Sequence, residues 1–315
     1  MKMSVENKKY SILVVDDEPE IRELLSDYLA DDAGYTVHTA STGEEALDSV
    51  LPSHAVDLVL SDINMPGMKG FELLNEVRER YPNTRRVLIT AYDVEDYIEM
   101  ALLHDVGNIF VKTTPFNFSE LSGMIKSLLL QDIFGARRFF DGRSTVHERL
   151  FTISQGRRID QDAKKIVSLL PSWAQHRKLN LVLMELLTNA VFYGARNEKP
   201  DHKEKWQYNF ELTDEETISV SVVWDTDKYA ISIVDKGGRL RKREVLYWLH
   251  RQTARGNDNM PLGVYDSHGR GFYIARQYID RLIINIDPLV KTEVVVINYL
   301  NDIYQGSKPL YINEL

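Results

Sequence analysis

Short apolar runs that alternate with helical stretches are the feature that most constrains this 315-residue chain. Four runs lie at residues 12–15, 58–60, 87–89 and 109–111, and a weaker one lies at 36–40. Five strands that alternate with helices predict a doubly wound parallel α/β sheet with right-handed crossovers. Because open α/β sheets bind ligands outside the carboxyl ends of their strands, we expect the function to lie where these runs end.

Polar residues follow four of these runs at the predicted strand ends. Asp16 and Asp17 follow the run at 12–15, and Asp62 follows the run at 58–60. Thr90 follows the run at 87–89, and Lys112 follows the run at 109–111. These side chains are expected to share one crevice, because parallel strands end at the same edge of a sheet. Mg²⁺ binds few protein carboxylates together with phosphate oxygens and water, so this set suits phosphoryl transfer. The acid pair alone would also suit an ordinary helix start.

The stretch at residues 58–70 reads LVLSDINMPGMKG and places Asp62 between a buried strand and a loop rich in turn formers. With the strand-end residues, it resembles the phospho-acceptor loop of two-component receiver domains, and the resemblance covers residues 1–130. It implies that Asp62 is phosphorylated and that Lys112 and Thr90 bind the phosphoryl oxygens. The magnesium ligands that it implies are Asp16, Asp17, Asp62 and the main-chain carbonyl of Asn64.

The same resemblance implies a switch at Thr90 and Phe110. On phosphorylation, the hydroxyl is expected to turn toward the phosphoryl group and the aromatic ring to turn inward, which repacks the face of the fourth and fifth strand-helix units. One departure is that the family's proline directly after the lysine is absent. Here Lys112 is followed by two threonines and only then by Pro115.

A connector follows the predicted receiver domain. Residues 120–134 carry apolar side chains at helical spacing, which indicates the last receiver helix. The apolar pattern continues through Phe139 and Phe140 to an expected turn at Asp141 and Gly142. This extra apolar surface predicts contact with a second domain or a twin subunit. The predicted boundaries are a receiver domain at 1–130, a helical connector at 131–144 and a second domain at 145–315.

The second domain is predicted from alternating elements and three motifs. A strand is expected at 145–154, helices at 160–170 and 179–193, strands at 217–224 and 229–234, and a helix at 272–278. The long helix carries Glu185 and Asn189 four residues apart, and therefore on one face. The second strand of the pair runs into Asp235, Lys236, Gly237 and Gly238, and the last helix opens with His268, Gly269, Arg270, Gly271 and Phe272. Glycines at a helix N-terminus let backbone N–H groups approach phosphate.

The ordered motifs ELLTNA, DKGG and HGRGFYIARQYIDRL resemble the Bergerat-type ATPases, and among these most closely the anti-sigma-factor serine kinases, over residues 145–300. The resemblance implies an α/β sandwich with a mixed sheet that binds ATP and Mg²⁺. It implies that Asn189 binds the magnesium on ATP and that Glu185 is the general base for a protein hydroxyl. Asp235, beside Gly237 and Gly238, would bind adenine. The residues that would hold the phosphates are Gly269, Arg270 and Gly271.

Three features of the second domain leave alternatives open. Arg239 replaces the second glycine of the family's adenine motif, and Tyr193 stands where the serine kinases often have histidine. The basic span at 239–263 is consistent with an ATP lid whose cations meet the triphosphate, or with a solvated helix followed by a loop.

Composition limits the function classes. The chain contains no apolar run near the ~18 residues of a membrane-spanning helix and no signal-peptide core, so we expect a cytoplasmic protein without membrane contact. The absence of cysteine agrees with a reducing compartment. The net charge of −9 argues against direct nucleic-acid binding, which needs a basic face.

The predicted function is a response regulator in which phosphorylation of Asp62 controls an ATP-binding output domain, and that domain is a protein serine/threonine kinase of the anti-sigma type. Its expected partners are a cognate sensor histidine kinase, an anti-sigma antagonist-like protein and a sigma factor. A homodimer is also compatible with the sequence. An alternative is an ATP-binding module that sequesters partners without kinase activity. A hybrid histidine kinase, suggested by His147, is disfavoured because too few residues separate it from Glu185 for a dimerisation hairpin.

Overall fold

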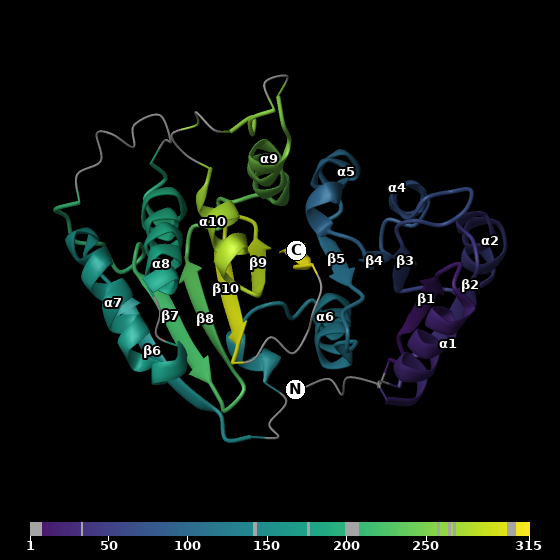
Figure 1. Cartoon of the computed structure of the whole chain (residues 1–315), viewed down its shortest axis with the longest axis horizontal. Coiled ribbons are helices and arrows are strands. Elements are labelled where there is room, and N and C mark those ends of the chain that lie inside the picture. Colours follow the sequence, from purple (N-terminus) through teal and green to yellow (C-terminus); the bar gives the residue numbers. More distant parts are fainter. Residues whose placement is uncertain are drawn as a thin grey trace, which may run out of the picture.

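One β-sheet of eleven strands runs through both predicted domains in the computed structural model (Figure 1). The structure describes residues 8–32, 34–140, 144–174, 177–198, 208–256, 259–263, 266, 269–300 and 307–315. Figure 1 shows the N-terminal part in purple to blue beside the C-terminal part in teal to yellow, and the C-terminus lies between them. The predicted order of elements therefore leads to one continuous sheet rather than two separate ones.

The N-terminal part contains the five parallel strands that the sequence predicts. They are β1 (Ser11–Val15), β2 (Thr36–Ala40), β3 (Leu58–Asp62), β4 (Arg85–Thr90) and β5 (Asn108–Val111), in the spatial order β2-β1-β3-β4-β5. All five residues of β1 and of β3 are buried, as expected for strands covered on both faces. The doubly wound α/β fold of this part is confirmed.

Helices cover both faces of these strands. They are α1 (Pro19–Asp27), α2 (Gly43–Glu45), α3 (Leu51–Ser53), α4 (Gly70–Arg80), α5 (Ile98–His104) and α6 (Phe118–Leu130). Alternate residues of β1 point to opposite faces, so Leu13 packs in the core with α4 and α5, whereas Ile12 packs in the core with α1 and α6. Pro19 suits the first turn of α1, because proline lacks the backbone N–H that would have no partner at that position.

The C-terminal part is a sheet with helices mainly on one face, and a parallel pairing with the C-terminal strand, described below, makes it mixed. Its strands are β6 (His147–Ile153), β7 (Ile218–Trp224), β8 (Lys228–Asp235), β9 (Arg281–Asp287) and β10 (Lys291–Tyr299), and neighbouring strands run antiparallel. Its helices are α7 (Ile159–Leu169), α8 (Arg177–Asn189), which continues as a π-helix at Ala190–Ala195, α9 (Lys242–Thr253) and α10 (Gly271–Tyr278). The predicted strands β6 to β8 and helices α7, α8 and α10 are confirmed, whereas β9 and β10 were not predicted.

The two faces of the C-terminal sheet have different covers. Ile231 and Ile233 of β8 pack with buried side chains of α7, α8 and α10, while Ala230, on the opposite face, packs with α6 and the connector. Ala136 and Phe140 of the connector lie in that second core. The apolar surface of the connector is therefore used within this chain, in contact with the second part, as one of the two expectations has it.

The connector itself differs from the expected continuous helix. Helix α6 ends at Leu130, because Gln131 adopts the left-handed conformation with φ of 53°. A short 3-10 helix at Ala136–Phe139 follows. The expected turn at Asp141 and Gly142 lies outside the described residues.

The C-terminal strand β11 (Leu310–Glu314) joins the two parts of the sheet. It pairs antiparallel with β5 through Leu310 and Tyr311, and parallel with β9 from Tyr311 to Glu314. Gly107 is required beside it, since a Cβ atom there would lie 2.2 Å from the carbonyl oxygen of Ile312. This strand covers two sheet edges that would otherwise expose unpaired backbone groups. It was not predicted from the sequence.

Among the described residues, every helix is too short or too polar to cross a membrane.

Candidate functional site

Three predicted residues meet at the carboxyl edge of β1, β3 and β5. The ammonium of Lys112 lies 2.7 Å from Oδ1 of Asp62 and 2.9 Å from Oδ2 of Asp16. All three side chains are at least nine-tenths buried. The parallel strands end side by side, which brings residues that are far apart in the sequence into one ion cluster. This arrangement offers a carboxylate nucleophile held beside a buried cation.

Burial and ion pairing act in opposite directions on the pKa values of Lys112 and Asp16. Burial works against the charge of Lys112, but hydrogen bonds and charges from Asp62, and then from Asp16, outweigh it and raise the pKa of Lys112. Burial also raises the pKa of the Asp16 carboxyl, and Lys112 opposes only part of that effect. The lysine therefore stays cationic and is available to an anion that arrives at Asp62.

The remaining predicted receiver residues surround the cluster less closely. The backbone N–H of Asn64 donates to Oδ2 of Asp62 at 2.6 Å, whereas the Asp17 side chain is exposed. The hydroxyl of Thr90 is buried and accepts a hydrogen bond from the N–H of Tyr92 at 3.0 Å. The only cis peptide bond of the described residues precedes Pro115.

The predicted inward turn of Phe110 needs correction. Its ring is already 1% exposed and lies 5.5 Å, between centroids, from the ring of Phe116. Phe116 in turn contacts the ring of Phe118, at the start of α6. The ring is buried because α6 and the adjoining core cover β5. Any switch at this position must therefore begin from a buried ring.

The donor set at Asp62 is compatible with magnesium. Within the described residues, no three histidine, cysteine or acidic side chains are already gathered to hold a metal ion. Magnesium does not need such a cage, because it usually takes one or two carboxylates together with waters and phosphate oxygens. The buried carboxylates of Asp16 and Asp62 provide oxygen ligands of that kind. Asp17 could add a ligand only from the solvent side.

A second candidate site is a cavity of about 340 Å³ between α8, α9, α10 and the end of β8. Four predicted nucleotide-binding residues line it: Asn189, Asp235, Gly269 and Gly271. Outside the lining lie the other three, Gly237, Gly238 and Arg270, and the predicted general base, Glu185. Gly271 permits close packing here, since a Cβ atom would lie 2.8 Å from Nδ2 of Asn189 and 3.5 Å from Oε2 of Glu185.

Asp235 forms the buried end of this cavity. The N–H groups of Gly237 and Gly238 donate to its Oδ1 at 2.9 and 3.2 Å, and burial raises the pKa of Asp235 to about 6. Thr292 lies opposite Asp235 in the β8–β10 pair and also lines the cavity. Its buried hydroxyl oxygen has no hydrogen-bond partner among the described residues. A buried polar atom of this kind indicates a ligand or water.

Sequence reasoning missed Thr292, because its place beside Asp235 depends on a pairing between strand residues 57 positions apart, which no local pattern reports. It also missed the role of Arg239. The guanidinium of Arg239 donates to the carbonyls of Gly194 and Ala195 at 2.8 and 3.2 Å and lines the cavity. It therefore holds the last carbonyls of the helix that carries Asn189.

The basic span at 239–263 contains helix α9, as the alternative of a helix followed by a loop expects. Trp248 and Glu244 of α9 line the cavity. Two cations of the span are engaged by protein carboxylates: Lys242 lies 2.8 Å from Asp105, and Arg251 lies 2.6 Å from Asp266. The lid interpretation is therefore corrected for these two cations, which already have partners. His268 of the glycine motif lies outside the described residues.

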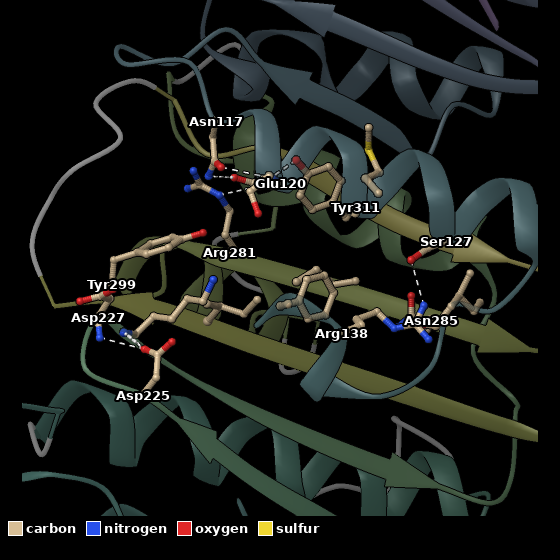
Figure 2. A pocket seen from close by; sticks show the side chains of 18 of the residues that line it. Asn117, Glu120, Ser127, Arg138, Asp225, Asp227, Arg281, Asn285, Tyr299 and Tyr311 are labelled. Atoms are coloured by element: carbon tan, nitrogen blue, oxygen red, sulfur yellow. Dashed lines mark hydrogen bonds and ion pairs between the residues drawn. The ribbon is translucent and has the colours of Figure 1, made fainter. Parts of the chain in front are cut away.

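A buried polar contact joins α6 to the C-terminal sheet (Figure 2). Oε1 of Glu120 accepts hydrogen bonds from Nε of Arg281 at 2.6 Å and from the hydroxyl of Tyr311 at 2.8 Å. Figure 2 shows these side chains at the edge of a cavity of about 410 Å³ between α6 and strands β9, β10 and β11. Asn117, which follows Phe116 in the chain, donates to the second oxygen of Glu120 at 2.7 Å. This contact connects the Phe110 side of the N-terminal part to β9.

Replacing Glu120 by glutamine should lower the free energy of unfolding by about 3 kcal/mol, because Arg281 would keep a buried charge without its counter-ion. Urea unfolding followed by fluorescence measures this loss. Glu76→Gln is the matched control: Glu76 pairs with Arg80 at 2.7 Å on the surface and should contribute less than about 1 kcal/mol. Equal losses in the two variants would contradict a structural role for the buried pair.

Comparison with known proteins identifies the N-terminal part. Residues 12–126 match the response regulator receiver domain family. The sporulation initiation phosphotransferase F of Bacillus subtilis is 34% identical over 118 residues, which cover 38% of this chain and 92% of that protein. The probable transcriptional regulator ycf27 of Cyanidium caldarium is 34% identical over 131 residues, which cover 40% of this chain and 51% of that protein, so the chain spans about half of its length.

Among solved structures, the response regulator TrrA of Thermotoga maritima, in complex with Mg²⁺-BeF, is 42% identical, with 38% of this chain and 98% of that chain covered and a TM-score of 0.34. The residues matched to the sequence family include the Asp62 cluster and all five parallel strands except Ser11. Through residues 12–126, this chain belongs to the response regulator receiver domain family.

Proposed function

We propose that Asp62 is phosphorylated in a magnesium-dependent reaction and that this modification controls an ATP-binding output domain at residues 145–315. The observation that carries the first step is the buried cluster in which Lys112 contacts both Asp62 and Asp16. A cognate sensor histidine kinase is the proposed phosphoryl donor, since two-component receivers accept their phosphoryl group from such kinases.

The chemistry at Asp62 is a displacement at phosphorus. A carboxylate oxygen of Asp62 forms the new bond to phosphorus while the bond to the donor's leaving group breaks and its electron pair departs with that group. Lys112 remains protonated and neutralises the incoming phosphoryl oxygens. Magnesium, when bound by Asp16 and its neighbours, would reduce the repulsion between the carboxylates and the phosphoryl group. Thr90 would exchange its bond with Tyr92 for one with a phosphoryl oxygen.

The output proposal depends on the second cavity. Asp235 presents a buried carboxylate and Thr292 an unpaired hydroxyl, which suits the amino group of adenine. At the other side, Asn189 and the glycines that open α10 suit magnesium and phosphate oxygens. We infer a protein serine/threonine kinase of the anti-sigma type, with an antagonist-like protein as substrate and a sigma factor as the regulated partner.

Glu185 separates this kinase from a second candidate, an ATP-binding module that sequesters partners. Its position outside the cavity lining favours the second candidate, while its place one turn before Asn189 favours a base beside the phosphates. Incubation with labelled ATP and candidate antagonist proteins, with Asp62 phosphorylated or not, tests the kinase. Absence of serine phosphate in every receiver state would defeat it.

For an active kinase, Glu185→Gln should leave ATP affinity unchanged and lower phosphoryl transfer by about 100-fold or more, as expected for loss of a general base. The measurement pairs an ATP titration with a single-turnover transfer assay. If this variant instead regulates its partner fully in cells, the sequestering module is the better description.

The structure argues against the hybrid histidine kinase. His147 begins the edge strand β6 and its ring stacks on Trp224 with 5.4 Å between centroids. A phospho-accepting histidine of that class would lie on a dimerisation helix, whereas His147 lies on a strand and packs against Trp224.

A further inference from the structure

We infer that residues 307–309 link the loop after Thr90 to helix α10, and so position the start of α10 at the nucleotide cavity according to the state of the receiver domain. This inference rests on the proposed function and adds a contact that the Phe110 side does not use. The segment precedes β11 in the chain and bonds to both parts of the protein.

The receiver end of this link is the hydroxyl of Ser307. It donates to Oδ1 of Asp93 at 2.7 Å and accepts from the N–H of Val94 at 3.0 Å. Both partners follow Thr90 within four residues, in the loop where Tyr92 holds the Thr90 hydroxyl. A movement of Thr90 toward a phosphoryl group would break the bond with Tyr92 and release this loop. Because Ser307 both donates to this loop and accepts from it, Ser307 would move with it.

The other end of the link is the last turn of α10. The guanidinium of Arg276 donates to the carbonyls of Pro309 at 2.6 Å and Lys308 at 3.1 Å. In return, the ammonium of Lys308 donates to the carbonyls of Arg276 at 2.6 Å and Gln277 at 2.9 Å. Arg276 is 4% exposed. Loss of these hydrogen bonds would leave a buried charged group without acceptors, which is strongly unfavourable. The segment and α10 therefore move together.

Helix α10 carries this position to the cavity. It has eight residues, from Gly271 to Tyr278, and a rise of about 1.5 Å per residue makes it a rigid rod of about 12 Å. Gly271, at its start, lines the cavity and packs against Asn189. Gln277, at its other end, also donates to Oε1 of Glu95 in the receiver domain at 3.3 Å. A shift of the Thr90 loop is thereby passed to the residues proposed to hold ATP phosphates.

This route is distinct from the Glu120 contact. Phe110, Ile125 and Ile283 belong to the core on one face of the sheet, whereas Val94 and Ala275 belong to the core on the other face. Ser307 and Arg276 are positioning residues, since they act on the cavity through α10. For the link to couple Asp62 to the nucleotide cavity, the loop after Thr90 must have two arrangements, and the phosphoryl group must change their populations.

Hydrogen exchange of the α10 amides in the full chain, with and without acetyl phosphate and magnesium, tests the link. In the wild-type protein, phosphorylation should change exchange across α10, and Ser307→Ala should reduce that change by about threefold to tenfold, the effect of one or two hydrogen bonds. Ser307→Thr keeps the hydroxyl and should restore the response. Ser168→Ala is the control, because the Ser168 hydroxyl donates to the carbonyl of Lys165 within α7. Intact mass confirms that every variant is phosphorylated equally.

A wild-type response in Ser307→Ala, or no response of α10 in a fully phosphorylated wild-type protein, would overturn the link. An ATP titration of the same samples keeps the two proposals apart. Failure of the wild-type protein to bind ATP would defeat the output function, while the exchange response of α10 would still decide whether the receiver domain positions that helix.

Discussion

An Asp62→Asn protein should take up no phosphate from acetyl phosphate and magnesium, whereas the wild-type receiver domain becomes labelled. The amide of asparagine lacks the anionic oxygen that forms the bond to phosphorus, and its neutral group also removes the carboxylate nearest to Lys112. Intact-mass measurement, followed by mapping to the peptide that contains residue 62, gives the result directly. The expected effect is complete loss.

Asp57→Asn is the matched control for this experiment. Asp57 lies just before β3, at the opposite end of the strand from Asp62, and its carboxylate bonds Lys8 at 2.6 Å and the N–H of Ser11 at 2.9 Å. Labelling of this variant should equal that of the wild-type protein. Magnesium-dependent phosphate on the Asp62→Asn protein would show that another residue is the acceptor and that the buried cluster has a different role.

Asn189→Ala should weaken ATP binding by about 10- to 100-fold and leave the labelling of Asp62 unchanged. A hydrogen bond or ligand contact to a charged group contributes about 1.5–3 kcal/mol, which corresponds to this range of affinity. The side chain lies on α8 and lines the cavity, so its loss removes a polar contact from the site without touching the receiver domain. Titration calorimetry with ATP and magnesium provides the affinity.

A second asparagine on the same helix serves as the control. Asn180 lies near the start of α8 and away from the cavity lining, so Asn180→Ala should bind ATP as the wild-type protein does. Unchanged ATP affinity in Asn189→Ala would remove this residue from the proposed site. Loss of labelling at Asp62 in the same variant would instead indicate damage that spreads through the shared sheet.

The shared sheet changes how coupling between the two parts should be considered. In the structure, α5 packs against α9, β5 pairs with β11, and α6 contacts β9 through the Glu120–Arg281 pair. The C-terminal part thus lies directly on the face of the receiver domain that the resemblance expects to repack. Phosphorylation would act on a formed interface, and the connector is only one of several contacts across it.

The local order of the chain determined most of its elements. Alternating apolar runs identified all five receiver strands, and the residues after those runs included the three that meet at Asp62. In the second part, periodicity identified α7, α8 and α10, and placed Glu185 and Asn189 on one face. These predictions succeed because strand and helix periods are local properties, and because parallel strands end at one edge whatever their neighbours.

Only the tertiary structure decided how the two parts meet. Nothing near Leu310 in the sequence indicates that β11 lies between β5 and β9. Every sheet edge exposes the same unpaired N–H and C=O groups, so the burial of side chains determines which edges the strand joins. The same holds for the Glu120–Arg281 pair, for Thr292 beside Asp235 and for Ser307 on the Thr90 loop. Each contact joins residues far apart in the chain, so its existence depends on the packing of whole elements and not on any local pattern.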